Sequence, residues 1–392
     1  MGKGEPPTIA PGDQPLWYRA RGWLLCLVLL GSSFMGALFI LTPLLPLLFL
    51  SPYQWRRLVD RLVGIWVAMP GTLLEYLWGA RVRVVGHKIE HADPALIIMN
   101  HRTRLDWLFF WTALFTIDPW LLVSEKITLK GILKYVPGAG WAMGCNAFIF
   151  LDRSFETDKT KIDRMIDYYS NSGFNYQMLL FPEGTDKCPL ATARSEKFAA
   201  KMGLAHYDYV LHPRTTGFVH IVQRMRQNGY IKWLYDVTVG FNDSIVQSEV
   251  ELVTHGLAPT DIHYQVVKIP IDSLPEDDAG LATWLTDHWA KKEEKLREFY
   301  TRGNQDVSTF PIPEGGQEYK LTSSLTDGRI FIVVFWTLVF VMWTYFAFAV
   351  KGVAVLGALS ILFFVAAHKV YGGVEWLAID RAEAHRRSLK QE

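Results

Sequence analysis

The 392-residue sequence predicts an α/β layered domain that apolar helices anchor to a membrane. Short runs rich in β-branched and aromatic residues alternate with helical patterns between about residues 81 and 300, which is typical of layered α/β domains. Long uncharged runs lie on both sides of this region. Half of all residues are hydrophobic while 20% are charged, a balance that favours a membrane-attached globular domain.

The first uncharged run extends from Gly22 to Leu50 and follows a polar leader. Because about 20 apolar residues cross the hydrocarbon core, this run either spans the membrane or re-enters it. Pro43 and Pro46 predict a kink. A cleaved signal peptide is the alternative, but the run is long for one and the leader is polar. Residues 1–80 are therefore predicted to hold the leader and an N-terminal membrane segment.

Residues 81–300 are predicted to form the α/β domain. The strand-like runs are 81–85, 95–99, 120–123, 147–151, 177–181, 209–211, 233–241 and 263–269. Helical patterns cover 159–170 and 280–300. In the second of these, an inward stripe is predicted from Leu281, Trp284, Leu285, His288, Leu296 and Phe299. Residues 301–329 begin with a Pro- and Gly-containing stretch and are predicted to be a linker.

The second uncharged region predicts a transmembrane helical hairpin over residues 330–371. Its two apolar runs, 330–350 and 353–367, are separated by Lys351 and Gly352. Basic residues follow the first and the last apolar run, so both clusters are predicted to be cytosolic. The α/β domain and the basic tail 372–392 would then face the cytosol, and the glycosylation sequon at Asn242 would stay unused.

Composition also excludes several classes of function. A net charge of +1 argues against a nucleic-acid partner. The three cysteines form neither a disulfide framework nor a zinc motif, and we expect no metal. The chain has no GxSxG elbow, P-loop or HExxH motif, so a protein nucleophile of the serine-hydrolase kind is not expected.

The segment Asn100-His101-Arg102-Thr103-Arg104-Leu105-Asp106 directly follows the apolar run 95–99. A His and an Asp at this spacing after a strand predict a general base with a carboxylate that orients it. In a chain of this composition, chance alone gives on average about half a match to a His followed five positions later by an Asp. His101 is nevertheless the only one of the 11 histidines with an Asp at this spacing.

Two further motifs follow strand-like runs. Phe181-Pro182-Glu183-Gly184-Thr185 follows the run 177–181, and His212-Pro213-Arg214 follows 209–211. Ligands of open α/β sheets bind beyond the carboxyl ends of strands, so these motifs could share one crevice with His101. Thr185 and Arg194 are donors suited to phosphate oxygens. Ordinary surface turns are the alternative. A base without a nucleophile, beside anion-binding donors, favours activation of a hydroxyl on an amphiphilic phosphate-bearing substrate.

These motifs, with Phe148-Ile149-Phe150-Leu151-Asp152-Arg153, resemble those of the HX4D glycerolipid acyltransferase superfamily of 1-acylglycerol-3-phosphate acyltransferases. The wider sequences around them are most similar to the lysocardiolipin acyltransferase branch. The resemblance implies a central mixed sheet and transfer of an acyl group from acyl-CoA, a co-substrate, with no cofactor. The acceptor would be an anionic lysophospholipid: lysocardiolipin, lysophosphatidylinositol, lysophosphatidylglycerol or lysophosphatidic acid. It also implies an endoplasmic reticulum membrane, with the mitochondrion-associated membrane as the alternative.

The resemblance implies roles for individual residues. His101 would deprotonate the acceptor hydroxyl while Asp106 holds the imidazole. Phosphate recognition would fall to Arg153, Glu183, Gly184, Thr185 and Arg194, and Pro213 with Arg214 would lie near acyl-CoA. Arg102 and Arg104 would contact substrate or face lipid headgroups. The second motif is longer than the family's FIDR-like form, and His212 and Arg214 depart from the family's usual residues, so either of these two could be structural.

Two other classes of function remain open at this point. A non-catalytic lipid-binding or membrane-shaping protein would keep its function after His101→Ala. A lipase or transacylase that works without CoA would need a nucleophile that the sequence does not supply.

Overall fold

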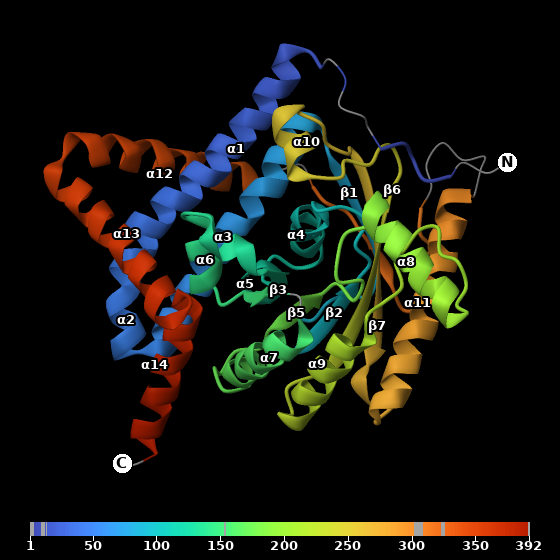
Figure 1. Ribbon diagram of the computed structural model, residues 1–392. Coiled ribbons are helices and arrows are strands. Elements are labelled where there is room, and N and C mark those ends of the chain that lie inside the picture. The colour runs from blue at the N-terminus through green and yellow to red at the C-terminus, as the bar shows by residue number, and fades with distance from the viewer. Residues whose placement is uncertain are drawn as a thin grey trace.

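A mixed β-sheet lies at the centre of the computed structural model, which describes residues 4–8, 12, 14–152, 154–301, 309–322 and 326–390 (Figure 1). Eight strands of this described part pair in the order β4-β3-β5-β2-β6-β7-β1-β8. Their bounds are β1 Arg81–Gly86, β2 Ala95–Met99, β3 Glu125–Lys130, β4 Ile149–Leu151, β5 Gln177–Leu180, β6 Trp233–Phe241, β7 Asp261–Pro270 and β8 Gln317–Tyr319. The predicted α/β class is confirmed.

Strand β2 is the middle of a parallel block. It pairs in parallel with β5 on one side and β6 on the other, and β5 pairs in parallel with β3. All five residues of β2 are buried, as expected for a strand that is covered on both faces. Because these strands share a direction, their carboxyl ends meet at one edge of the sheet. The antiparallel pairs, β6 with β7 and β1 with β8, lie toward the other side.

Helices cover both faces of the sheet, and alternate residues of β2 enter two cores. Ala95, Ile97 and Met99 pack with α3 and α4, whereas Leu96 and Ile98 pack with α7, α9 and α11. Within the described residues the α-helices are α1 Leu16–Gly36, α2 Leu45–Leu50, α3 Pro52–Trp78, α4 Asp106–Ile117, α5 Leu121–Ser124, α6 Ala139–Cys145, α7 Phe155–Ser170, α8 Pro189–Met202, α9 Thr215–Gln227, α10 Glu249–Thr254, α11 Asp278–Thr301, α12 Arg329–Ala349, α13 Lys351–Tyr371 and α14 Val374–Leu389.

Two predicted strands are wrong. Residues 120–123 begin a helical turn, because Asp118 Oδ1 accepts the N–H of Trp120 at 3.0 Å and the strand β3 starts only at Glu125. Residues 209–211 form no strand, because their backbone N–H groups donate hydrogen bonds to side-chain carboxylates instead of to a neighbouring strand. The N–H groups of Tyr209 and Val210 donate to Glu293, at 2.8 and 3.1 Å.

Three helical stretches of the described chain are long and apolar enough to cross a membrane: Leu16–Leu50, Arg329–Ala349 and Lys351–Tyr371. In the first, a π-helical turn at Ala37–Leu41 and a 3-10 turn at Thr42–Leu44 interrupt the regular helix where the prolines predict a kink. The Ala37 carbonyl accepts both the backbone N–H of Thr42 and, at 2.9 Å, the Thr42 hydroxyl.

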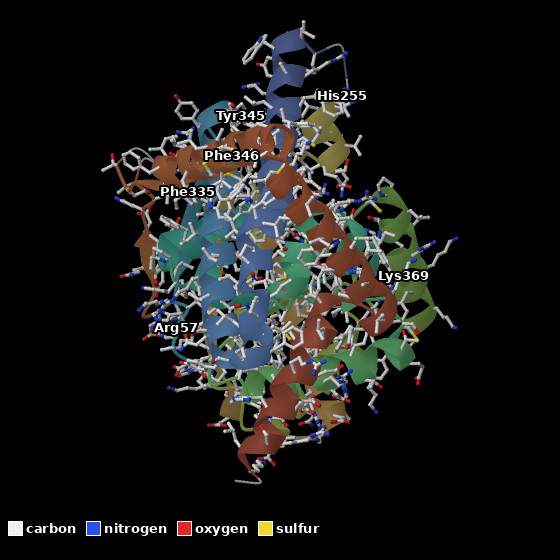
Figure 2. The ribbon with its side chains drawn as sticks, turned by 90° about the vertical axis from the view of Figure 1, so that its left-hand side faces the viewer. Arg57, His255, Phe335, Tyr345, Phe346 and Lys369 are labelled. Carbon is white, nitrogen blue, oxygen red and sulfur yellow. The ribbon has the colours of Figure 1, made fainter. Side chains whose placement is uncertain are left out.

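The apolar helices form one side of the molecule, opposite α8 and α11 (Figure 1). Figure 2 shows Phe335, Tyr345 and Phe346 projecting from α12 on this side. Helices α12 and α13 form the predicted hairpin. The segment predicted as a linker supplies β8, which pairs with β1 and so fixes this segment to the sheet.

A buried ionic network joins α3 to the sheet. Asp60 of α3 accepts from Arg56 at 2.7 Å and from Lys126 of β3 at 2.9 Å, and the Tyr176 hydroxyl donates to it at 2.7 Å. Burial lowers the pKa of Lys126 to about 8. Because an unpaired charge is costly in a buried place, this network holds the sheet against α3, the helix that follows the N-terminal apolar segment.

Candidate active site

The carboxyl end of β2 presents His101 to Asp106, the first residue of α4. His101 Nδ1 and Asp106 Oδ2 are 3.0 Å apart, and the two side chains are 13% and 0% exposed. A carboxylate accepts only, so this contact places the imidazole proton on Nδ1 and leaves Nε2 as the basic nitrogen. The predicted pair is therefore assembled with the geometry that a general base needs.

Asp106 is held by Thr103. The Thr103 N–H donates to Oδ2 at 3.0 Å, and its hydroxyl donates to Oδ1 at 3.1 Å. A position in the first turn of α4 also favours negative charge through the helix dipole. Sequence reasoning gave no role to Thr103, although Thr-x-x-Asp is the spacing of a reciprocal cap and could have indicated one.

Asn100 and Phe181 fix the surroundings of His101. The Asn100 amide donates to the Val239 carbonyl at 3.1 Å and accepts the Val239 N–H at 2.9 Å, which ties the end of β2 to β6. The Phe181 ring lies against the imidazole, with centroids 4.2 Å apart and planes at 27°. Neither role was predicted from the sequence.

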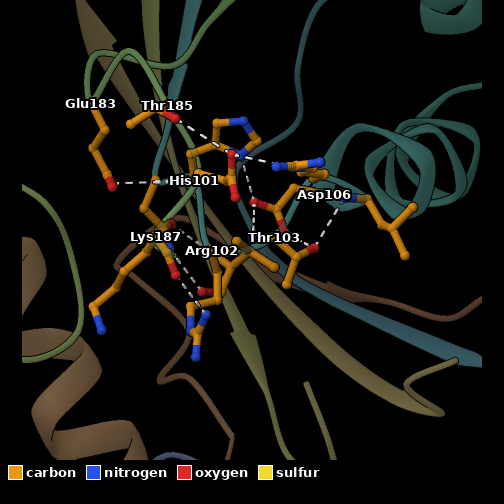
Figure 3. A network of polar contacts seen from close by, with 12 residues as sticks. His101, Arg102, Thr103, Asp106, Glu183, Thr185 and Lys187 are labelled. Atoms are coloured by element: carbon orange, nitrogen blue, oxygen red, sulfur yellow. Dashed lines mark hydrogen bonds and ion pairs between the residues drawn. The ribbon is translucent and has the colours of Figure 1, made fainter. Parts of the chain in front are cut away.

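Glu183 connects three segments around the site, and Figure 3 shows its contact with the backbone of His101. Its Oε1 accepts the His101 N–H at 3.1 Å and the Trp289 indole N–H at 3.3 Å, and its Oε2 accepts the Leu211 N–H at 3.0 Å. Burial raises the pKa of this carboxyl to about 7. Protein donors thus surround both oxygens, and direct recognition of a phosphate by Glu183 stays a prediction.

The turn after β5 brings Gly184 beside Arg214. Gly184 has φ +73°, and a Cβ added there would lie 3.1 Å from the Arg214 Cδ. The Arg214 N–H donates to the Pro182 carbonyl at 2.8 Å, so two of the predicted motifs meet here. Arg214 itself is exposed, and the Thr185 hydroxyl is 3.4 Å from Asp186 Oδ1.

The other predicted binding residues are placed differently. Arg102 is buried, whereas Arg104 is half exposed and lies 3.7 Å from both Asp186 and Glu249. Arg194 is exposed on α8, and Pro213 is half-buried. Arg153 lies outside the described residues.

His212 makes structural contacts. Its Nδ1 accepts from the Ser195 hydroxyl at 2.9 Å, while Nε2 lies 3.1 Å from the Ala205 carbonyl. Its ring stacks on Tyr207 with centroids 4.2 Å apart. Burial lowers the pKa of His212, so the neutral ring ties α8 to the loop before α9.

An apolar cavity of about 300 Å³ lies between the sheet and the membrane helices. Its wall includes Trp107 and Leu108, the two residues that follow Asp106, and Glu249, which faces Arg104. The other walls include residues of α1, α3, β3 and α6, and Trp336 of α12. This space suits an alkyl chain, because nearly every lining side chain is apolar.

The arrangement can take a proton from a hydroxyl at Nε2 and stabilise the resulting imidazolium through Asp106. Among the described residues, no group of three or more His, Cys, Asp or Glu side chains could hold a metal ion.

Comparisons with known proteins agree with these features. The Acyltransferase family profile matches residues 81–241, and the Acyltransferase C-terminus profile matches 253–336. The chain is 42% identical over 377 residues to lysophosphatidylinositol acyltransferase 10 of Caenorhabditis elegans, covering 94% of this chain and 95% of that protein. It is 38% identical over 361 residues to lysocardiolipin acyltransferase 1 of Gallus gallus, covering 92% and 94%. The crystal structure of the 1-acyl-sn-glycerophosphate acyltransferase of Thermotoga maritima aligns with a TM-score of 0.44 and 15% identity, covering 74% of this chain and 100% of that one.

Proposed function

This chain belongs to the acyltransferase family, and from that premise we propose that it transfers a fatty acyl group from acyl-CoA to the free hydroxyl of an anionic lysophospholipid. The observation that carries the proposal is the His101–Asp106 pair at the carboxyl edge of the sheet. Relatives that match almost the whole chain are named for lysophosphatidylinositol and lysocardiolipin.

The reaction follows from the tautomer of His101. Nε2 accepts the proton of the acceptor hydroxyl while the hydroxyl oxygen attacks the thioester carbonyl. Asp106 stabilises the imidazolium, and the tetrahedral intermediate then expels the CoA thiolate, which receives the proton. General-base catalysis of this kind contributes about 10²- to 10⁴-fold to the rate.

The apolar cavity supports a fatty acyl substrate. It approaches the site at Trp107, directly after Asp106, and extends between α3, α6 and α1. An alkyl chain in this space would leave water, with a gain of about 0.8 kcal/mol per methylene.

The exposed cations near the site support an anionic acceptor. Arg214 lies beside Gly184, and Arg104 is half exposed next to the cavity wall. A guanidinium suits phosphate oxygens because it offers paired donors in one plane.

The apolar helices and the basic residues after them support an integral membrane protein with a cytosolic catalytic domain. We place it in the endoplasmic reticulum membrane, with the mitochondrion-associated membrane as the alternative. A cytosolic site would be open to acyl-CoA.

The test is an acyl-transfer assay in membranes from cells that express the protein. Labelled oleoyl-CoA is offered with each of four lysophospholipids: lysophosphatidylinositol, monolysocardiolipin, lysophosphatidylglycerol and lysophosphatidic acid. A parallel reaction replaces oleoyl-CoA by a labelled phospholipid donor. Transfer that needs both acyl-CoA and an anionic acceptor supports the proposal. Transfer from the phospholipid donor alone favours a transacylase, and no transfer above control membranes favours a lipid-binding protein.

A further inference from the structure

Residues 4–8 lie across the catalytic edge of the sheet, far along the chain from any catalytic motif. Thr8 forms a parallel bridge with Ile245, and the Ile245 N–H donates to the Pro7 carbonyl at 3.2 Å. In Figure 1 this part of the chain runs on the side of α8 and α11, away from the helical hairpin. This backbone pairing fixes the segment beside the loop that follows β6.

Glu5 pairs with the residue next to the catalytic histidine. The Arg102 Nε and Nη2 donate to the two carboxylate oxygens of Glu5, at 2.6 and 2.9 Å. The side chains of Arg102 and Glu5 are 8% and 18% exposed. A bidentate pair that water reaches so little is held more strongly than a surface ion pair.

The same guanidinium gathers the loops that build the site. Arg102 Nη1 donates to the Lys187 carbonyl at 3.2 Å and to Gln247 Oε1 at 3.1 Å. The Lys187 N–H in turn donates to the His101 carbonyl at 2.8 Å. Gln247 Nε2 donates to the Arg102 carbonyl at 3.3 Å and to Asp186 at 3.0 Å. The loops that contain His101, Lys187 and Gln247 therefore meet at one buried cation, the guanidinium of Arg102. The counter-ion of this cation is Glu5, which comes from residues 4–8.

The pair does not block the base. Figure 3 shows the Arg102 guanidinium and the His101 imidazole pointing away from each other, so Glu5 acts on the far side of the loop. A polar cavity of about 300 Å³ adjoins this region and is lined by Thr8, Arg102, Gln247 and residues of the first turns of α8.

We propose that Glu5 is a positioning residue for acyl transfer, because through Arg102 it holds the His101 loop in register with the Lys187 and Gln247 loops. The inference rests on the proposed function for its kinetic readout. Without the carboxylate, Arg102 keeps only neutral acceptors, and a buried cation in that state draws the surrounding loops out of place. Small displacements of a general base lower turnover more than binding.

The kinetic test compares Glu5→Gln and Glu5→Asp with the parent in membranes, using oleoyl-CoA and the best acceptor. We expect Glu5→Gln to lower kcat about tenfold while KM for either substrate changes less than about twofold. Glu5→Asp, which keeps the charge, should retain more than about half of kcat. The double variant Glu5→Gln with Arg102→Gln should lose no more than Arg102→Gln alone, because Glu5 acts through Arg102.

Glu196→Gln is the matched control. It removes an exposed carboxylate that lines the same polar cavity but makes no hydrogen bond or ion pair with Arg102. Its kcat should stay within about twofold of the parent. Equal kcat for Glu5→Gln and Glu196→Gln overturns the inference, as does a kcat for Glu5→Gln above that of the parent, which would mean that the segment restrains the site.

Hydrogen–deuterium exchange in detergent separates this inference from the proposed function. Peptides that cover residues 100–106 and 182–188 should exchange faster in Glu5→Gln than in the parent or in Glu196→Gln. If the parent transfers no acyl group, the proposed function fails, and exchange still decides whether Glu5 orders the two loops. Unchanged exchange in Glu5→Gln overturns the positioning role.

Discussion

Asp106 sets both the orientation and the tautomer of His101. We predict that Asp106→Asn lowers kcat by roughly 10²- to 10⁴-fold, because a neutral amide cannot stabilise the imidazolium that forms when His101 takes the proton of the substrate hydroxyl. Initial rates in membranes with matched protein amounts measure the effect.

The chain offers a second His–Asp pair as the control for this substitution. His91 Nδ1 and Asp118 Oδ2 are 2.6 Å apart at the other end of α4. Asp118→Asn should change the rate less than about twofold. Similar rates for the two variants would mean that the negative charge of Asp106 does not assist His101 in the rate-limiting step.

The raised pKa of Glu183 leads us to predict that the stability of the protein depends on pH. Its pKa in the folded protein is raised to about 7 from an ordinary 4.5. The folded state therefore holds the proton more tightly than the unfolded state between these values, and the contribution to the free energy of unfolding is lost as pH rises through this window. Thermal unfolding in detergent between about pH 5 and pH 8 should show the parent losing its advantage over Glu183→Gln as pH rises. Parallel curves would show that Glu183 does not titrate there.

At the residue scale, the sequence predicted the base His101 and the carboxylate Asp106 that orients it. The two residues are five positions apart just after the end of a strand, and this spacing brings their side chains together. The sequence could not predict the bonds of Glu183 or Glu5, because their partners come from distant segments and leave no local pattern. The role of Glu183 in phosphate recognition stays a prediction, and the structure adds that donors from three segments surround its carboxylate.

Among the elements, the turn between β5 and α8 depends on Gly184. We predict that Gly184→Ala lowers activity about tenfold, because a left-handed φ of +73° strains alanine and the new Cβ would press on Arg214. The measurement is the initial rate of acyl transfer together with the thermal unfolding midpoint.

Gly203→Ala is the control for this turn. Gly203 ends α8 with φ +66°, and a Cβ there would have nothing within 4 Å. It should lose a similar amount of stability, about 1 kcal/mol, but keep its activity. Equal activity losses would assign the effect of Gly184→Ala to backbone strain alone.

Element prediction succeeded where the pattern was long. The runs 95–99 and 233–241 coincide with β2 and β6, and α11 buries Leu281, Leu285, Leu296 and Phe299 of the predicted stripe. The prediction failed at 120–123, where the Asp118 side chain accepts a backbone N–H and starts a turn. It also failed at 209–211, where the buried carboxylates of Glu293 and Glu183 accept the backbone N–H groups. Short apolar runs do not reveal such competition.

In the whole molecule, the apolar cavity lies where the sheet meets the membrane helices. We predict that Ala142→Phe, which enters this cavity from α6, lowers transfer from oleoyl-CoA at least fivefold relative to decanoyl-CoA, an effect of about 1 kcal/mol. Ala200→Phe, at an exposed position of α8, is the control and should leave the ratio unchanged. An unchanged ratio in Ala142→Phe would place the acyl chain elsewhere.

At the scale of the whole molecule, the alternation of strand-like and helical segments predicted the α/β class, and the hydropathy of the two C-terminal apolar runs predicted the helical hairpin. They did not predict that residues 317–319 add a strand to the sheet or that residues 4–8 reach the site, because pairing between distant segments depends on the folded arrangement.

The most direct test of the central claim is the rate of acyl transfer from labelled oleoyl-CoA by the parent and by His101→Ala, in membranes with equal amounts of folded protein. The account predicts transfer to an anionic lysophospholipid by the parent and a rate for His101→Ala that equals control membranes. A His101→Ala variant as active as the parent would contradict the assignment of His101 as the catalytic base.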